Sequence, residues 1–561
     1  MNAFSFNAGF TQQNAQTASA AAGNPLASML LGYASGGGVS YNIASAFQQI
    51  YYGAFVQDSW RVNDRFTLTL GLRWDYEGPM SERYNRQNAG FDINATNPLQ
   101  SKVTGMTLKG GLLFTDANNR LPFVRDLNNW GPRIGGSYRL FKNTVLRGGY
   151  GITYSPTFQS GNANGFNSTT SYISSNDANL TPAGNMVNPF PTGIIPPVGS
   201  SLGLSTLLGQ GFTFADPQRT IPRVQQYSLG LQHQLPGQFV LEVSFAGNDA
   251  TELPVSKGIN AIPRQFYALP GSTPPVPSAT LVAQVTNPMA GLLPGSSLNN
   301  STIAYQSLQV PFPEFGGITE QYRPLGQSVY NSMQVSGEKR FSRGLQARLS
   351  FTWDKIMQQT GYLNDQDDWS NLRRSQAGEP SKILALATTY TLPWFAKGTG
   401  WQHQLFGGWE MNAVVRYLNG NLVNAPGAYS SGVNPKITDG RTYQQWFNTC
   451  SLSATGVRQN CASDTQPVAF IGLPSYTLNT LGPVLPGIRT EIPVNVDFAI
   501  FKTFSLTERA KIQFRANAYN LANTPQFGGP NTSFGSANFG LITLSQVNDP
   551  RIVELALKLS F

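Results

Sequence analysis

This chain of 561 residues is poor in histidine, cysteine and charged residues. Its two histidines are His233 and His403, and charged residues make up 12% of the sequence, where globular proteins carry roughly 25%. Neither histidine stands in a recognisable nucleophile–base arrangement, so a catalytic triad is not supported. Neither lies near a cysteine in a metal-binding spacing. We therefore expect no enzyme, no cofactor and no metal site.

Long apolar runs are also missing. No segment approaches the roughly 18 to 20 continuous apolar residues of a transmembrane helix. The net charge is +9, but lysine and arginine are scattered singly and form no dense basic block, so we expect no nucleic-acid partner. If the chain enters a membrane, it does so with β-strands.

The end of the chain carries the clearest pattern. From Ile552 to Phe561 apolar and polar residues alternate strictly, which predicts a two-faced β-strand. One face holds Leu555, Leu557, Leu559 and Phe561, a set typical of a strand that faces lipid. We predict that these four residues act as a membrane-assembly signal read by the barrel-assembly machinery. We also expect this strand to close a barrel by pairing with the first strand.

The same alternation recurs in paired strands with short turns. In 66–76 every even position is apolar or aromatic, and 52–62 precedes it through a turn at 63–65. Five further hairpins follow, at 133–140 with 145–154, 225–234 with 239–247, 330–340 with 345–353, 383–392 with 409–418, and 494–504 with 510–520. Together with the last strand this gives about 13 strands, and one or two more fit before Tyr51.

Long segments separate the hairpins, for instance 77–130, 155–222, 248–327 and 419–493. Typical connections are about 4 to 6 residues long, so these segments argue against a compact soluble domain. They match outer-membrane barrels, which have short periplasmic turns and long extracellular loops. If the C-terminus is periplasmic, every short turn lies on the periplasmic side. The loops are read either as flexible linkers or as the ligand-facing surface.

The predicted fold is thus all-β: an antiparallel transmembrane β-barrel of outer-membrane type, with about 14 to 16 strands in this chain. We divide the chain into an N-terminal segment, 1–50, partly irregular with room for one or two strands, and a barrel with long loops, 51–561. The start shows no basic region followed by a continuous apolar stretch. We favour the interpretation that the chain is the C-terminal part of a longer precursor.

Charged residues within the strands and aromatic residues near the strand ends indicate which face of each strand points to the lumen and where the membrane surfaces lie. A charge facing lipid costs on the order of 2 to 4 kcal/mol near the midplane, so we expect most charged strand residues to face the lumen. These are Arg73, Asp75, Arg133, Arg139, Arg147, Glu242, Arg348, Glu410, Arg416, Asp497, Lys511, Arg515 and Lys558. Aromatic residues near strand ends predict two girdles at the membrane surfaces. The set is Tyr51, Tyr52, Trp74, Tyr76, Tyr154, Trp353, Tyr390, Trp394, Trp409 and Tyr417.

Three smaller features are candidate sites. Cys450 and Cys461 flank a short polar stretch, so we predict a loop disulfide in an oxidising compartment, with two unpaired thiols as the alternative. The segment 364–368, NDQDD, clusters oxygen donors but lacks the glycine and glutamate of a calcium loop, so a solvated loop is favoured. Gly148, Gly149 and Gly151 lie in a strand without a following helix, which favours close packing on the barrel wall over phosphate binding.

Several segments resemble the barrel region of TonB-dependent receptors, specifically the Oar-like group. They are YYGAFVQDSWRVNDRFTLTLGLRWDYEGP (51–79), WGPRIGGSYRLFKNTVLRGGYGITY (130–154), VNVDFAIFKTFSLTERAKIQFRANAYNLANTPQF (494–527) and NDPRIVELALKLSF (548–561). The resemblance implies an outer-membrane barrel of about 22 strands with a plug in its lumen. We recognise no plug-like segment or TonB box in this sequence, so contact with the TonB complex is expected through a plug outside it.

The function expected from this resemblance is binding of an external small-molecule or peptide ligand and its passage to the periplasm. A passive porin-like channel, and a surface adhesion or scaffold barrel without transport, remain alternatives. Outer-membrane lipid is the expected surrounding. The identity of the ligand does not follow from the sequence.

Overall fold

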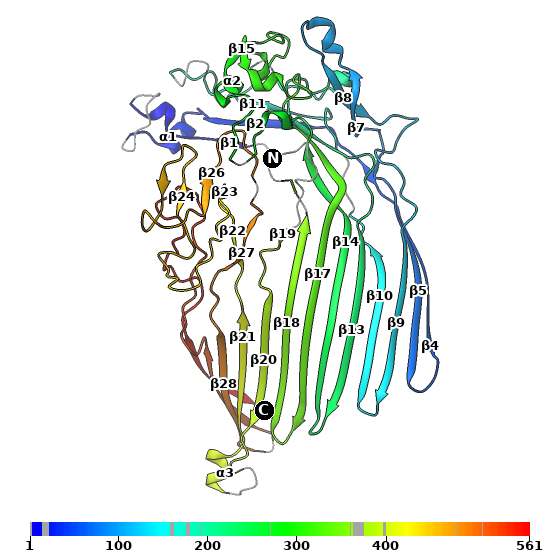
Figure 1. Cartoon of the computed structure of the whole chain (residues 1–561), viewed down its shortest axis with the longest axis vertical. Helices are drawn as coiled ribbons and strands as arrows, with labels where there is room; N and C mark the ends of the chain where they lie inside the picture. The colour runs from blue at the N-terminus through cyan, green and yellow to red at the C-terminus, as the bar shows by residue number, and fades with distance from the viewer. Residues whose placement is uncertain are drawn as a thin grey trace.

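A computed structural model gives the fold, and it describes residues 3–13, 22–157, 162–175, 180–191, 193–269, 271–359, 361–362, 375–395, 400–479, 481–507 and 509–561. One large antiparallel sheet dominates these residues, and we call it the wall (Figure 1). Its fifteen strands agree with the expected number of about 14 to 16. Two of them, β12 (Phe212–Ala215) and β19 (Ser375–Gln376), lie off the main path, which leaves thirteen strands in a row.

The strands of the row alternate in direction, and each pairs with its neighbours in the row. In order they are β4 (Tyr51–Arg61), β5 (Phe66–Glu77), β9 (Trp130–Phe141), β10 (Thr144–Tyr154), β13 (Arg223–Leu235), β14 (Phe239–Gly258), β17 (Ile318–Ser342), β18 (Leu345–Gln359), β20 (Lys382–Thr391), β21 (Trp409–Leu418), β28 (Asn495–Ser505), β29 (Lys511–Tyr519) and β30 (Ile552–Ser560). The hairpins expected from the alternation are all present.

The short connections lie at one end of the wall and the long ones at the other (Figure 1). The C-terminus lies at the end with the short turns, so both lie on the same side of the membrane. The connection between β20 and β21 includes helix α3 (Trp401–Phe406), which extends beyond that end. We call the two ends of the wall the turn end and the loop end.

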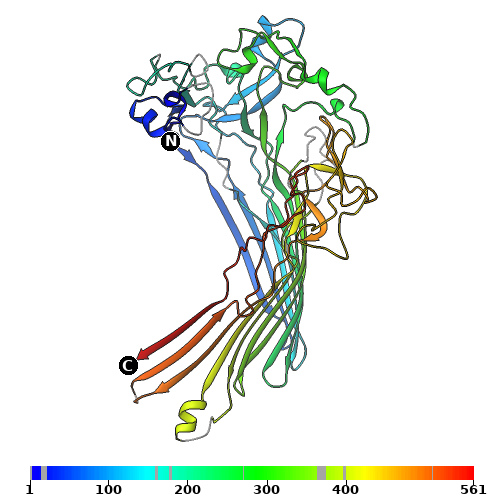
Figure 2. The ribbon, with the colours of Figure 1, turned by 90° about the vertical axis from the view of Figure 1, so that its left-hand side faces the viewer.

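The wall is an open, curved sheet (Figure 2). Its two edges are β4 and β30, and among the described residues these strands do not pair with each other. The expected pairing of the last strand with the first is therefore wrong. The reason is geometric: in a row of thirteen strands that alternate in direction, the first and last run parallel. An all-antiparallel ring through both edges requires an odd number of additional strands.

The long loops fold together at the loop end into a second region, which we call the cap (Figures 1 and 2). Its strands are short, namely β1 (Ala3–Ser5), β2 (Gly36–Asn42), β3 (Phe47–Gln48), β6 (Ser81–Glu82), β7 (Asn88–Thr96), β8 (Lys109–Phe114), β11 (Asn167–Ser171), β15 (Gln284–Thr286), β16 (Thr302–Ala304), β22 (Leu422–Asn424), β23 (Ala428–Ser430), β24 (Ser451–Leu452), β25 (Arg458–Gln459), β26 (Phe470–Gly472) and β27 (Val484–Arg489). Its helices are α1 (Pro25–Leu30) and α2 (Ser278–Val282). No helix in the described part of the chain is long and apolar enough to cross a membrane.

Most of the buried apolar residues lie in the cap. One cluster centres on Phe447 and Phe470, a second on Phe91 and Phe315 with the neighbouring end of β17, and a third joins the loops 97–108 and 287–308. The described parts of these loops are packed structures, so the interpretation of the long loops as flexible linkers is wrong for them.

Candidate ligand-facing surface

The strand register divides the wall into two continuous faces. Directly opposed residues of paired strands lie on the same face, so one face can be followed from β4 to β30 through successive pairs. All the charged residues expected to face the lumen lie on one face, which we call the polar face. Its first members are Arg73 opposite Gly131, and Arg133 opposite Gly151.

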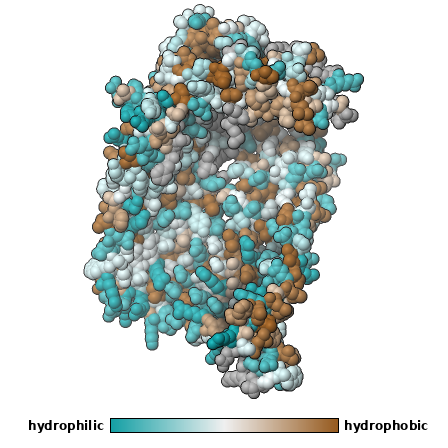
Figure 3. Space-filling view, turned by 180° about the vertical axis from the view of Figure 1, so that it is seen from behind, coloured by the Kyte–Doolittle hydropathy of each residue, from teal (hydrophilic) through white to brown (hydrophobic). Residues whose placement is uncertain are grey.

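The opposite face, which we call the apolar face, exposes large hydrophobic side chains. Leu70 is 48% exposed, Leu229 56% and Leu555 73%. The register places Leu557, Leu559 and Phe561 on the same face as Leu555. Figure 3 shows the wall from behind, the side toward which the sheet curves in Figure 2, and hydrophilic side chains cover most of its strands there. The polar face is therefore the concave, lumenal face, and the apolar face is the outer one.

Aromatic side chains line both ends of the apolar face. At the loop end, Trp74 stacks on Tyr76 and contacts Trp130, with ring centroids 6.2 Å apart in each pair. At the turn end lie Tyr390 and Trp409. This is the arrangement of the two expected girdles. Tyr51 is an exception, because it lies on the polar face.

Tyr51 instead belongs to a polar network at the loop end of β4 and β5. Its hydroxyl hydrogen-bonds to Asp75, and Arg73 donates from Nε to Asp75 Oδ1 at 2.8 Å and from Nη2 to the Tyr51 hydroxyl at 2.9 Å. The positive charge of Arg73 is thus neutralised within the wall. The neighbouring cation on this face, Arg133, is not.

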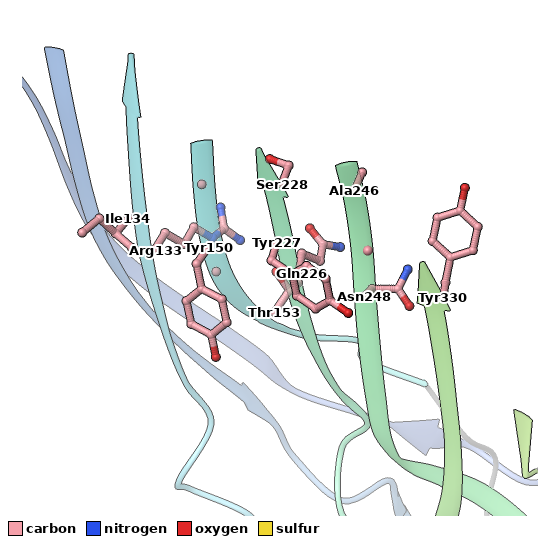
Figure 4. A pocket seen from close by; sticks show the side chains of 13 residues that line it. Arg133, Ile134, Tyr150, Thr153, Gln226, Tyr227, Ser228, Ala246, Asn248 and Tyr330 are labelled. Atoms are coloured by element: carbon pink, nitrogen blue, oxygen red, sulfur yellow. The ribbon is translucent and has the colours of Figure 1, made fainter. Parts of the chain in front are cut away.

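Arg133 lies in a hollow on the polar face of the wall. Gly71 and Gly151 are its direct neighbours on β5 and β10, so no neighbouring side chain covers it on either side. Its guanidinium is exposed and has no hydrogen-bond or ion-pair partner among the described residues. The hollow has a volume of about 530 Å³ and extends across β9, β10, β13, β14 and β17 (Figure 4). Its other polar lining residues that belong to the polar face are Thr153, Gln226, Ser228, Asn248 and Tyr330.

A second hollow of about 420 Å³ lies nearer the turn end of the same strands. Arg147 on β10 contributes to it, together with Lys142 in the β9–β10 turn and Arg340 on β17. Gln232, Gln234 and Gln238 supply most of its remaining polar groups. Two hollows that contain basic residues thus follow one another along the polar face, from the loop end toward the turn end.

A buried ion pair ties the cap to the wall. Arg219 of the loop 155–222 lies 3.6 Å from Glu77 at the loop end of β5, and both side chains are almost completely buried. Glu77 also accepts hydrogen bonds from Gln49 Nε2 at 2.8 Å and from the Thr157 amide at 2.9 Å. Burial lowers the pKa of Arg219, and the charge of Glu77 opposes that shift. The junction is therefore held by a charge pair that needs both partners.

A buried carboxyl group lies inside the cap. Glu314 is 0% exposed, and neither of its carboxylate oxygens hydrogen-bonds to another described residue. It lies between Phe312 and Phe315, which belong to the second apolar cluster. Burial raises the pKa of Glu314 to about 7. Sequence reasoning missed this group, because a single glutamate in a loop gives no signal of burial.

The other candidate residues from the sequence are the two cysteines, the glycines of β10, the acidic segment and the histidines. A disulfide joins Cys450 and Cys461 beside the first apolar cluster, where Cys450 is 0% exposed. Gly148, Gly149 and Gly151 lie within β10, as the strand interpretation requires. The acidic segment 364–368 lies outside the described residues. His233 Nδ1 lies 2.8 Å from the Thr144 hydroxyl.

Among the described residues, no three metal-ligating side chains come together. The assembly role of Leu555, Leu557, Leu559 and Phe561 stays a prediction, as does the division of the chain at residue 50. Residues 3–5, 36–42 and 47–48 form strands in the cap, outside the wall.

An antiparallel wall with an exposed apolar outer face and a polar concave face defines an outer-membrane barrel protein. Comparison with known families agrees: the model of the outer membrane beta barrel domain matches residues 2–554. The chain belongs to this family, and it is a protein of the outer membrane. The fold class and localisation expected from the sequence are confirmed. No curated protein matches the chain.

Solved structures with a similar course of the chain include outer-membrane receptors. The siderophore receptor PiuA from Acinetobacter baumannii is 10% identical with a TM-score of 0.39, and the match covers 92% of this chain and 43% of PiuA. The ferric-catecholate import receptor Fiu from E. coli K12 is 12% identical with a TM-score of 0.38, covering 92% of this chain and 45% of Fiu. The chain spans less than half the length of these receptors.

Proposed function

We propose that this chain is the barrel portion of an outer-membrane receptor of the TonB-dependent kind, which binds an external ligand on its polar face and passes it toward the periplasm. The observation that carries the proposal is the hollow around Arg133. Its volume of about 530 Å³ falls in the range of small-molecule sites, about 300 to 1,000 Å³. It is lined by neutral hydrogen-bonding groups around one cation that lacks a partner.

The position of the two hollows supports passage along the wall. A ligand that enters from the loop end meets the Arg133 hollow first and the Arg147 hollow second. Both lie on the concave face, away from the face suited to lipid. Repeated weak contacts along a polar surface allow a ligand to enter and also to leave, as conduction requires. The chain's own residues thus provide a route, and no bond is made or broken.

Binding to the purified full chain tests the site. A ferric tris-catecholate complex serves as an anionic probe, with quenching of tryptophan fluorescence as the readout. Arg133→Gln should weaken binding about tenfold or more, since a hydrogen bond to a charged group contributes about 1.5 to 3 kcal/mol. Arg139→Gln removes a charge from the same strand and face near the turn end, and should change binding less than twofold. Equal affinity of Arg133→Gln and the unaltered chain would overturn the site.

Liposome swelling separates the modes of passage. Rapid swelling with neutral sugars that increases with smaller sugars would identify a passive channel, whereas uptake of the probe in cells that stops without TonB would identify active passage. Binding of the probe without any effect on uptake in cells would favour a surface-binding barrel. The Arg133→Gln variant is included in each assay. An error in the assigned binding site can then be told apart from an error in the proposed mode of passage.

A further inference from the structure

Charged side chains are rare on the apolar face, and most of them lie near strand ends. A charge there must reach the membrane surface or find a partner within the protein. Four of these residues are lysines. Two lie near the turn end and have partners within the protein, and two lie near the loop end, close to the membrane surface. Where the described strands pair in regular register, the charged residues on this face are Asp58, Arg223, Asp249, Lys339, Lys355, Lys382 and Lys502.

The two lysines at the turn end are bound by the protein itself. Lys339 Nζ donates to the Gly237 carbonyl at 2.9 Å and lies 4.9 Å from the centre of the Phe239 ring. Lys502 Nζ donates to the His403 carbonyl at 3.3 Å, and also to that of Gly407. Both side chains are buried. Backbone carbonyl groups of the protein therefore already bind both ammonium groups.

The two lysines at the loop end are different. Lys382 lies directly opposite Trp353, and Lys355 follows Trp353 by two residues on the same face of β18. Both lysines are exposed, and neither ammonium has a hydrogen-bond or ion-pair partner among the described residues. Lys382 Nζ lies 5.8 Å from the centre of the Trp353 ring, which is itself 54% exposed. The residue opposite Lys355 is the neutral Asn331.

We infer that Lys355, Trp353 and Lys382 form a binding site for the phosphate-bearing headgroup of a lipid in the outer leaflet. Diagonal neighbours on adjacent strands lie roughly 7 to 8 Å apart, so the two ammonium groups can approach one headgroup from both sides. Trp353 is the neighbour of both lysines on this face, directly opposite Lys382 and two residues before Lys355. An amphipathic ring at this position contacts the boundary between headgroups and acyl chains. The site is on the lipid-facing side of the wall, so the occupant is a lipid and not a ligand of the lumen.

Lipid retention by the full-length chain tests this inference. The protein is refolded into phosphatidylcholine vesicles that contain a minor fraction of phosphatidic acid, extracted in mild detergent, and analysed by native mass spectrometry for bound lipid. The double variant Lys355→Gln/Lys382→Gln should lose phosphatidic acid about tenfold or more, since each lysine near an anionic surface contributes about fivefold. The control Lys511→Gln/Lys558→Gln removes two positive charges from the polar face, and should retain the lipid.

Further variants keep the result decisive. Lys355→Arg/Lys382→Arg retains both charges and should restore lipid retention, which excludes misfolding as the cause of a loss. Retention by the glutamine variant equal to that of the unaltered chain would overturn the inference. Displacement of phosphatidic acid by millimolar inorganic phosphate would also overturn it, because the site would then bind a free ion. A loss as large in the polar-face control would show non-specific charge attraction and contradict the assigned site.

Discussion

The wall and the cap use the same apolar residue types in opposite ways. In the wall, Leu557 is 75% exposed and Leu229 is 56% exposed, and no other element of the described chain covers their face. In the cap, Phe447 and Leu108 are 0% exposed and Phe470 is 1% exposed. The difference follows from the surroundings of each region. The cap folds in water and must bury its apolar side chains, whereas the wall places them against lipid.

Polar groups show the same contrast. In the cap, buried amide side chains bind backbone carbonyl groups: Asn97 Nδ2 donates to the Gly110 carbonyl at 2.8 Å, and Asn287 Nδ2 to that of Leu298 at 2.8 Å. These bonds hold irregular backbone in place without a regular sheet. On the polar face of the wall, by contrast, Arg133 is exposed and without a partner. Side chains fix the loops of the cap, while those on the concave face of the wall remain available to a ligand.

The largest effect is expected at the junction between the two regions. Arg219→Met should destabilise the attachment of the cap by about 3 to 5 kcal/mol, because Glu77 would remain buried without its charged partner. Limited proteolysis of the loop 155–222 measures the change, and the exposed Arg83→Met is the matched control. If both variants resist the protease as well as the unaltered chain, the ion pair does not hold the cap to the wall.

Stability of the cap should depend on pH through Glu314. Its pKa is about 7 in the folded chain and 4.5 in the unfolded chain, so the folded state holds a proton that the unfolded chain has released. The resulting stabilisation is fully present below pH of about 4.5 and is lost as pH rises through about 7, a change on the order of 3 kcal/mol.

Hydrogen exchange of the segment 308–317 at pH 5 and pH 8 measures this dependence. In Glu314→Gln the difference between the two pH values should largely vanish, because an amide does not titrate. A variant as sensitive to pH as the unaltered chain would show that another group is responsible.

The disulfide should have a slightly smaller effect, confined to the cap. Cys450 and Cys461 are 11 residues apart, and closing a loop of this length stabilises the folded state by about 2 to 3 kcal/mol. The Cys450→Ala/Cys461→Ala variant should therefore increase protease cleavage within 440–472. Heat-modifiable gel mobility, which shows whether the wall is folded, should not change. If protease resistance of 440–472 and the heat-modifiable mobility were lost together, the separation into two regions would be contradicted.

The smallest effect is expected from the end of the chain. Phe561 is 97% exposed on the apolar face. Its deletion should reduce the amount of protein assembled in the outer membrane several-fold without changing the stability of molecules that do assemble. Phe561→Tyr keeps an aromatic end and should assemble normally. Unchanged assembly after the deletion would contradict a role of the terminal residues as an assembly signal.

The wall could be predicted from the sequence because its rules are local. Alternation in 66–76 and 552–561 defines strands and assigns each side chain to a face, and short turns pair neighbouring strands. For this reason the predicted lumenal positions, such as Arg73 and Lys558, all lie on one face. The pairing of the two edges could not be derived in this way, since it depends on the direction of strands that are far apart in the sequence.

The cap could not be predicted from the sequence, because it is formed by contacts between loops that are far apart in the sequence. Phe91 packs against Phe312 and Phe315, and Tyr476 hydrogen-bonds to Gln306. Neither pair has a periodic signal, and the segments around them are rich in glycine, proline and asparagine. The hollow at Arg133 was also missed, because it depends on Gly71 and Gly151, which join Arg133 only through strand register.

Neighbouring residues on one central strand test the two faces of the wall directly. Val243 lies on the apolar face of β14, and Ser244 lies on its polar face. After refolding into lipid vesicles, the free energy of unfolding is measured in denaturant for Val243→Arg and Ser244→Arg. Val243→Arg should be less stable than Ser244→Arg by about 2 kcal/mol or more, because its charge would face lipid. Equal stability, or the reverse order, would contradict the assignment of the two faces.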